Sequence, residues 1–154
     1  MKITFAFLVS LICIQLFACS KNNEVEQTQN SNDMSNTNTT KMKITIGSAV
    51  FTATLSNNAT VTAFKARLPI TINMTELNGN EKYFNLPNAL PANASNPTTI
   101  QSGDLMLYGS NTLVLFYKTF STSYSYTRMG RIENPSGLIA ALGSESVTVK
   151  FELQ

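Results

Sequence analysis

Histidine and tryptophan are absent from this chain of 154 residues, and cysteine occurs only twice. Without histidine the chain cannot form a Ser-His-Asp triad, a Cys-His pair or a His-ligated metal site. Charged residues make up 13% of the sequence, and the net charge of +2 is too small for nucleic-acid binding without a clustered basic patch, which is not found. No Gly-rich phosphate loop, Cys-pair metal site or GxSxG elbow is present. We therefore expect no metal, no cofactor and no nucleic-acid partner.

The first 18 residues have the features of an export signal. Lys2 supplies a positive charge, and residues 3–17 are almost entirely apolar. As a helix, such a run is roughly 22 Å long, which is shorter than the roughly 30 Å hydrocarbon core of a membrane. We therefore interpret residues 1–18 as a signal peptide rather than a membrane span.

The signal ends in residues 16–19, Leu-Phe-Ala-Cys, which resemble the lipobox of bacterial lipoproteins. This resemblance implies cleavage before Cys19, acylation of Cys19 and the lipid bilayer as a partner. The alternative is an ordinary secretory signal that happens to contain a cysteine. Cys13 lies inside the apolar run, so the mature chain would have no other cysteine. The residue after the cysteine is Ser20 and not an aspartate. By resemblance to enteric lipoproteins, this implies that the protein is anchored in the outer membrane of a Gram-negative cell envelope.

Residues 19–41 are expected to hold the acylated cysteine and a polar tether. Val25 and Met34 are the only residues between Ser20 and Thr40 that could contribute to a core, and no periodicity is present. Such a segment cannot bury enough apolar surface to offset the entropy lost on ordering. We predict a disordered spacer that separates the membrane from a domain at residues 42–154.

Alternating apolar and polar residues make the domain mainly β. Eight short strands are expected, near residues 43–46, 51–55, 70–74, 83–86, 104–108, 113–117, 128–133 and 147–153. Two short helices are also predicted. The first is capped by Asn57-Asn58 and stopped by Pro69, and the second is capped at Asn134 and ends at Gly143.

The unbroken apolar run at residues 113–117 predicts a strand whose two faces are both covered. Residues 87–103 and 120–126 are expected to be long loops, and loops of this kind are often functional. Because sheet edges must be paired or covered, many short strands with two helices favour a closed barrel. The alternative is an open β-sandwich.

The domain resembles the bacterial cyclophilin-like family, a small barrel related in shape to the peptidyl-prolyl isomerases. The resemblance rests on an ordered set of segments, residues 42–47, 63–69, 103–108, 113–118 and 130–132. It implies a closed cyclophilin-like β-barrel of about eight strands with two short helices.

True cyclophilins place a catalytic arginine three residues before a proline, followed by a Gln-Gly-Gly stretch and later by tryptophan and histidine. Here Phe84 stands three residues before Pro87, and the other elements are absent. Such isomerases stabilise a twisted amide through a cationic donor. The resemblance therefore implies that the shape is kept and the catalytic residues are not. The alternative is a weak peptidyl-prolyl isomerase of the cell envelope.

Aromatic side chains are the strongest candidates for ligand binding, because tyrosine offers broad apolar area with a polar tip. Some of them must belong to the core. The candidate set is Phe84, Phe116, Tyr117, Tyr124, Tyr126 and Arg131. We expect a membrane-anchored, non-catalytic domain that binds a peptide segment or a small molecule, or else a subunit of a larger envelope assembly.

Charged residues offer weaker candidates, each with a structural alternative. Glu76 and Glu81 flank a predicted hairpin turn. Their carboxylates either converge as an acid-base pair or are two solvated charges near the tip of the hairpin. Asp104 is either a base or a turn cap. Arg128 and Arg131 are three residues apart on a strand and should point to opposite faces, so at most one enters a pocket. Arg131 holds either an anionic ligand or a structural ion pair.

Overall fold

The structure, a computed structural model, describes residues 39–154. The predicted signal peptide, Cys19 and nearly all of the predicted tether lie outside the described residues. Within residues 39–154, no helix combines the length and apolar character needed to cross a membrane.

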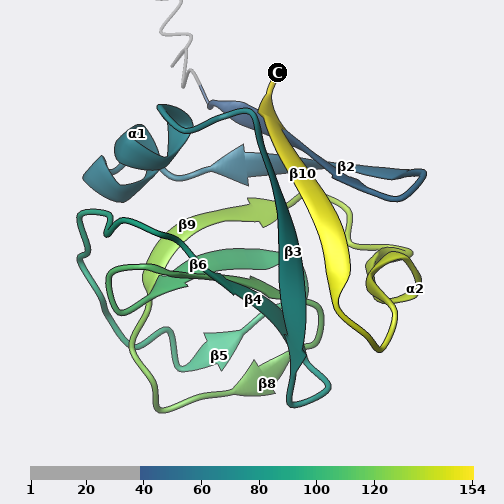
Figure 1. The fold of residues 1–154 in the computed structure, drawn as a ribbon. Coiled ribbons are helices and arrows are strands. Elements are labelled where there is room, and N and C mark those ends of the chain that lie inside the picture. The colour runs from purple at the N-terminus through teal and green to yellow at the C-terminus, as the bar shows by residue number, and fades with distance from the viewer. Residues whose placement is uncertain (1–38) are drawn as a thin grey trace, which may run out of the picture. The chain divides into compact units, whose positions relative to one another are not determined.

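Eight antiparallel strands close into a barrel (Figure 1). Around the barrel their order is β1-β10-β3-β4-β7-β6-β9-β2. The strands are β1 (Lys41–Ile46), β2 (Ala49–Leu55), β3 (Ile70–Leu77), β4 (Glu81–Asn85), β6 (Asp104–Tyr108), β7 (Thr112–Phe116), β9 (Thr127–Ile132) and β10 (Val147–Leu153). This arrangement confirms the predicted mainly β closed barrel, and the open sandwich is wrong.

Two further strands lie within the segments that were expected to be loops. β5 (Thr99–Ile100) and β8 (Phe120–Ser121) form a separate antiparallel two-stranded sheet. Figure 1 shows β5 and β8 side by side, next to β4 and β6 of the barrel. Because each strand has only two residues, neither is long enough to show alternation in the sequence.

Helix α1 (Ala59–Lys65) has the predicted cap. The Asn58 side-chain oxygen accepts a hydrogen bond from the backbone N–H of Val61 at 2.9 Å. The buried face of α1 packs on the barrel interior, where the Phe64 and Phe151 rings meet edge to face with centroids 6.1 Å apart. The helix ends at Lys65, ahead of Leu68, which is the residue that precedes Pro69.

Helix α2 (Leu138–Leu142) is shorter than predicted. Its N-cap is Gly137, which has no side chain to accept a hydrogen bond, so the predicted cap at Asn134 is wrong. Asn134 instead accepts the backbone N–H of Ser136 at 3.1 Å, which closes a turn ahead of the helix. Gly143 ends the helix with a positive φ of 59°, as expected from the sequence.

The barrel wall has an apolar core on each side at β7. Leu113 and Leu115 belong to the main core in the barrel interior, whereas Val114 and Phe116 face outward. The outer cluster consists of Ile100, Met106, Val114, Phe116 and Tyr126, with Tyr83 and Phe120 packed against it. The prediction that both faces of residues 113–117 are covered is therefore confirmed. The outer cover comes from the β5–β8 sheet and the loop that follows β8.

Candidate functional site

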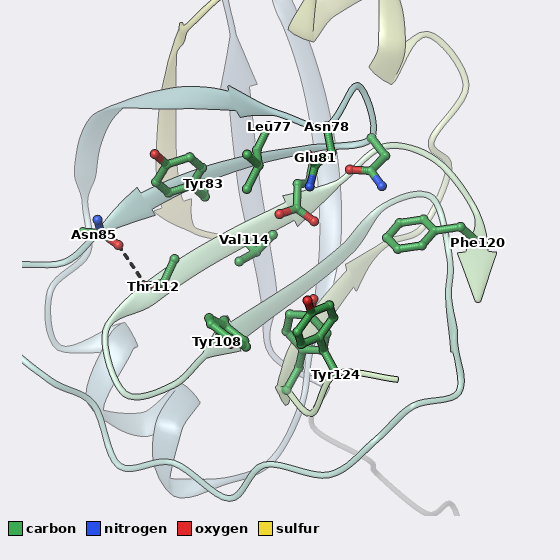
Figure 2. A pocket seen from close by; sticks show the side chains of 12 residues that line it. Leu77, Asn78, Glu81, Tyr83, Asn85, Tyr108, Thr112, Val114, Phe120 and Tyr124 are labelled. Atoms are coloured by element: carbon green, nitrogen blue, oxygen red, sulfur yellow. Dashed lines mark hydrogen bonds between the residues drawn. The ribbon is translucent and has the colours of Figure 1, made fainter. Parts of the chain in front are cut away.

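A pocket of about 390 Å³ opens on the outer face of β4, β7 and β6. Volumes of this size are typical of small-ligand sites. Figure 2 shows the side chains around it, which come from the β3–β4 hairpin, β6, β7, β8 and the loop after β8. The outer pocket is lined by Leu77, Asn78, Asn80, Glu81, Tyr83, Asn85, Tyr108, Thr112, Val114, Phe120, Tyr124 and Tyr126.

Three tyrosines form one wall of the outer pocket. The Tyr108 and Tyr124 rings meet nearly at right angles with centroids 6.1 Å apart, and Tyr108 lies 5.5 Å from Tyr126. Tyr124 is 61% exposed and Tyr108 is 46% exposed, so much of this aromatic area faces solvent. Edge-to-face contacts of this kind hold the rings in defined orientations.

The outer cluster packs beneath this wall and supports it. Phe116 is fully buried, and its ring lies 5.4 Å from that of Tyr126 and 5.8 Å from that of Phe120. Asn85 and Thr112 close the far end of the pocket, where the Thr112 hydroxyl donates to the Asn85 side chain at 2.8 Å (Figure 2). The pocket is therefore built on packed strands and is preformed on most of its sides.

Of the carboxylates in residues 39–154, Glu81 alone lines the outer pocket. Glu81 pairs with Phe116 across β4 and β7, and Figure 2 shows its carboxylate between Tyr83 and Phe120. Burial, together with the negative charge of Glu76, raises the pKa of Glu81 to about 6. Burial and the charge of Glu81 also raise the pKa of Tyr126, so the field of this carboxylate reaches across the pocket.

The sequence profile of the cyclophilin-like family matches residues 44–152, which cover nearly all of the described barrel. The chain belongs to the cyclophilin-like family. A hypothetical protein from Archaeoglobus fulgidus, solved in solution, has a similar fold, with a TM-score of 0.53 and 20% sequence identity. That match covers 75% of this chain and 95% of the other, and at this identity it shows a shared fold alone. No curated protein matches the sequence significantly.

The cyclophilin-like barrel separates the aromatic residues that the sequence grouped as one candidate set. Tyr124 and Tyr126 line the outer pocket, and Phe116 lies beneath it. Phe84, at the position that the resemblance aligned with the catalytic arginine, pairs with Leu113 and packs against the main core. Phe84 therefore does not line the outer pocket.

Tyr117 lies at a different place in the barrel. Its hydroxyl donates to Glu76 at 2.8 Å, and it lines a separate hollow of about 470 Å³ beside Gly143 and Ile139. Burial and this hydrogen bond raise the pKa of Tyr117 to about 12. Tyr117 thus contributes to a structural network and does not line the outer pocket.

Arg131 forms an ion pair, as its structural alternative predicted. Its Nε donates to the buried carboxylate of Asp104 at 2.6 Å, and Arg128 Nη1 lies 3.4 Å from the same oxygen. The expectation that the two arginines point to opposite faces is wrong, because the pairing of β6 with β9 shifts register between Leu105 and Met106. An extra residue on β9 at this bulge brings both arginines to one side.

Asp104 acts as a turn cap, the structural alternative to a base. Its Oδ2 accepts the backbone N–H of Gln101 at 2.9 Å, which closes the turn before β6. Its other oxygen, Oδ1, is contacted by the two arginines, and Asp104 does not line the outer pocket.

Glu76 and Glu81 do not form an acid-base pair. Glu76 pairs with Lys82 across the β3–β4 hairpin, and alternation along β4 places Glu81 on the opposite face from Lys82. Glu76 also accepts the hydroxyl proton of Tyr117 and the backbone N–H of Gly79, at 2.8 and 2.9 Å. The alternative of two solvated charges is also wrong, because Glu76 belongs to a partly buried network.

The sequence analysis missed several residues that matter here. Lys82 is fully buried, and Tyr83, Tyr108 and Asn80 line the outer pocket. Within residues 39–154, no cluster of three or more metal-binding side chains is present. The sequence does carry one indication that Lys82 is buried. Lys82 lies two residues before Phe84 on the same strand, so the two side chains share the face that Phe84 turns toward the main core.

Proposed function

We propose that this protein is a lipid-anchored, non-catalytic binding domain of the cell envelope that takes a peptide segment or a small molecule in the outer pocket. The observation that carries the proposal is the aromatic wall of Tyr108, Tyr124 and Tyr126, which lines the outer pocket. The outer cluster packs beneath this wall and holds it in place. Broad apolar surfaces with polar tips are typical of binding sites.

The charges around the pocket disfavour amide isomerisation. Among residues 39–154, no lysine or arginine lines it, and the only charged side chain that does is the carboxylate of Glu81. Isomerases of the cyclophilin kind stabilise the twisted amide with a cationic donor, whereas a carboxylate would repel the amide oxygen. Arg131 and Arg128 are both engaged with Asp104. A binding role therefore suits these residues better than turnover.

The binding proposal is tested with blocked single amino acids, N-acetyl amino-acid methylamides, as probes of peptide recognition. Full-length protein in detergent is titrated with the proline, phenylalanine, norleucine and lysine forms, and binding is followed by NMR. We expect shifts at residues of the outer pocket for at least one probe, and a loss of binding in Tyr124→Ala. Tyr124 is exposed, so this variant should fold normally. No pocket shifts with any probe would contradict the proposal.

The membrane anchor is tested separately. The order of apolar run, alanine and Cys19 supports lipid attachment, and acyl chains contribute about 0.8 kcal/mol per buried methylene to membrane binding. We expect Cys19→Ala to move the protein from the membrane to the soluble fraction, whereas Cys13→Ala should not. Persistent tight association of Cys19→Ala with outer membranes would reject the anchor.

The isomerase alternative has a direct assay. Acceleration of prolyl cis-trans exchange in a model peptide, abolished by Tyr108→Ala and Tyr124→Ala, would favour it over the binding proposal. We expect no acceleration above the uncatalysed rate, because the pocket holds no cationic donor.

A further inference from the structure

The carboxylate of Glu81, which lines the outer pocket, has no donor among residues 39–154. The Glu81 carboxylate forms no hydrogen bond or ion pair with another residue of the described chain. The neighbouring side-chain oxygen of Asn80 also accepts no hydrogen bond within residues 39–154, but it has almost no exposed surface and is not open to a ligand. Most buried polar groups in proteins have a partner, so a half-buried carboxylate without a donor indicates that a donor-bearing group belongs beside it.

No counter-ion within the described part of the chain balances the negative charge of Glu81. On β3, the charge of Glu76 is already paired with Lys82, whose Nζ lies 2.5 Å from Glu76 Oε2. On β6, Asp104 is paired with Arg131. A half-buried carboxylate without a counter-ion is costly, and a cationic ligand would remove that cost.

Aromatic rings surround the same carboxylate. Figure 2 shows Tyr83 and Phe120 on either side of Glu81, with Tyr108 and Tyr124 across the pocket. The faces of such rings attract cations within about 6 Å of the ring centroid. Rings and a carboxylate together favour an organic cation that carries both methylene groups and N–H donors.

We infer, on the basis of the proposed binding function, that the outer pocket recognises a protonated alkyl amine, with Glu81 as its counter-ion. The N–H groups of the ammonium donate to the carboxylate oxygens of Glu81, and its alkyl chain lies on Val114 and the tyrosine rings. The amine is either a free small molecule or the side chain of a lysine in a peptide.

The experiment compares cations with neutral molecules of similar size. Full-length protein in detergent is titrated at pH 7 with butylammonium and its neutral counterpart butan-1-ol, and with the N-acetyl methylamides of lysine and norleucine. We expect each cation to bind at least about tenfold more tightly than its neutral counterpart, which corresponds to about 1.4 kcal/mol. Tighter binding of blocked lysine than of butylammonium assigns the amine to a peptide, and the reverse order assigns it to a free molecule.

Glu81→Gln should reduce the affinity for each cation by at least about tenfold while leaving the affinity for the neutral probes unchanged. The matched control is Glu145→Gln, which removes an exposed carboxylate that does not line the outer pocket. If neutral probes bind as tightly as cations, or if Glu81→Gln binds cations normally, the inference is overturned while the binding proposal stands. If no probe binds, both are overturned.

Cation binding should also depend on pH. With the pKa of Glu81 at about 6, only about a tenth of the carboxylate is ionised at pH 5, so cation affinity should fall about tenfold between pH 7 and pH 5. The other titratable groups that line the pocket within residues 39–154 are the tyrosines Tyr83, Tyr108, Tyr124 and Tyr126. Lys118, exposed after β7, does not line the pocket. A cation affinity that is the same at pH 5 and pH 7 would contradict the inference.

Discussion

Lys82 Nζ lies 2.5 Å from Glu76 Oε2 although the lysine side chain is completely buried in the barrel. The ammonium also donates to the backbone oxygens of Glu145 and Gly143, at 2.7 and 3.0 Å, and lies 5.8 Å from the ring centroid of Tyr117. The ammonium is therefore held by one ion pair and two hydrogen bonds. The network joins the β3–β4 hairpin to the chain that leaves α2.

Replacing this lysine should destabilise the barrel strongly. In Lys82→Met, Glu76 loses its counter-ion and two backbone oxygens lose their donor, and breaking a buried pair in this way costs about 3 kcal/mol or more. Urea unfolding at pH 7 measures the change. Lys118→Met, at an exposed lysine, should change the free energy of unfolding by about 0.5 kcal/mol or less. Equal stability of the two variants would show that the network contributes little.

Glu76 should make the barrel less stable in acid. Burial raises the pKa of Glu76, but hydrogen bonds from Lys82 and Tyr117 and the charge of Lys82 outweigh it and lower the pKa below 4.5. The folded state then binds fewer protons than the unfolded state, so this stability is present above about pH 4.5 and is lost as pH falls through the folded pKa. Urea titrations from pH 3 to pH 7 should show a smaller acid loss in Glu76→Gln. The same acid loss in the variant and the wild type would contradict this assignment.

Glu81 should act in the opposite direction. Because its folded pKa of about 6 lies above the ordinary 4.5, the folded state binds more protons between these values, and stability falls as pH rises through this window. At pH 7 the free energy of unfolding of Glu81→Gln should therefore exceed that of the wild type by about 1 kcal/mol after allowing for solvent screening, and the variant should unfold at a higher temperature. The two proteins should be similar near pH 4. Thermal unfolding at both pH values checks this, and a variant less stable at pH 7 would refute it.

Gly130 is required where β9 pairs with β2. A Cβ at Gly130 would lie 2.6 Å from the backbone oxygen of Thr54 and 3.1 Å from Leu55 Cδ2. Because a ladder oxygen cannot move without disturbing β2, Gly130→Ala should cost about 2–3 kcal/mol in the free energy of unfolding. At Gly47 no atom lies within 4 Å of the added Cβ, so Gly47→Ala should cost only about 1 kcal/mol from its positive φ. Chemical denaturation of both variants at one pH compares these costs, and a smaller loss at Gly130 would be inconsistent with the close contact.

The outer pocket was only partly predictable. Tyr124 and Tyr126 were found because a loop rich in tyrosine is unusual, whereas Tyr108 and Tyr83 sit on strands where an aromatic residue is ordinary. For Glu81 the sequence offers an acid-base pair with Glu76 or a solvated charge, and neither alternative places it in a ligand pocket. Nothing local to Glu81 indicates that the β5–β8 sheet and its following loop come back to cover this face.

The sequence by itself determined the eight strands, the two covered faces of β7 and the barrel, because alternation and turns depend on residues that are close along the chain. The tertiary structure decided which charges are paired. Asp104 meets both Arg128 and Arg131 through a register shift, and Lys82 meets Glu76 inside the wall while Glu81 faces out without a partner. These outcomes depend on the pairing register between strands, which a one-residue slip would reverse, so the pattern within any single strand could not show them.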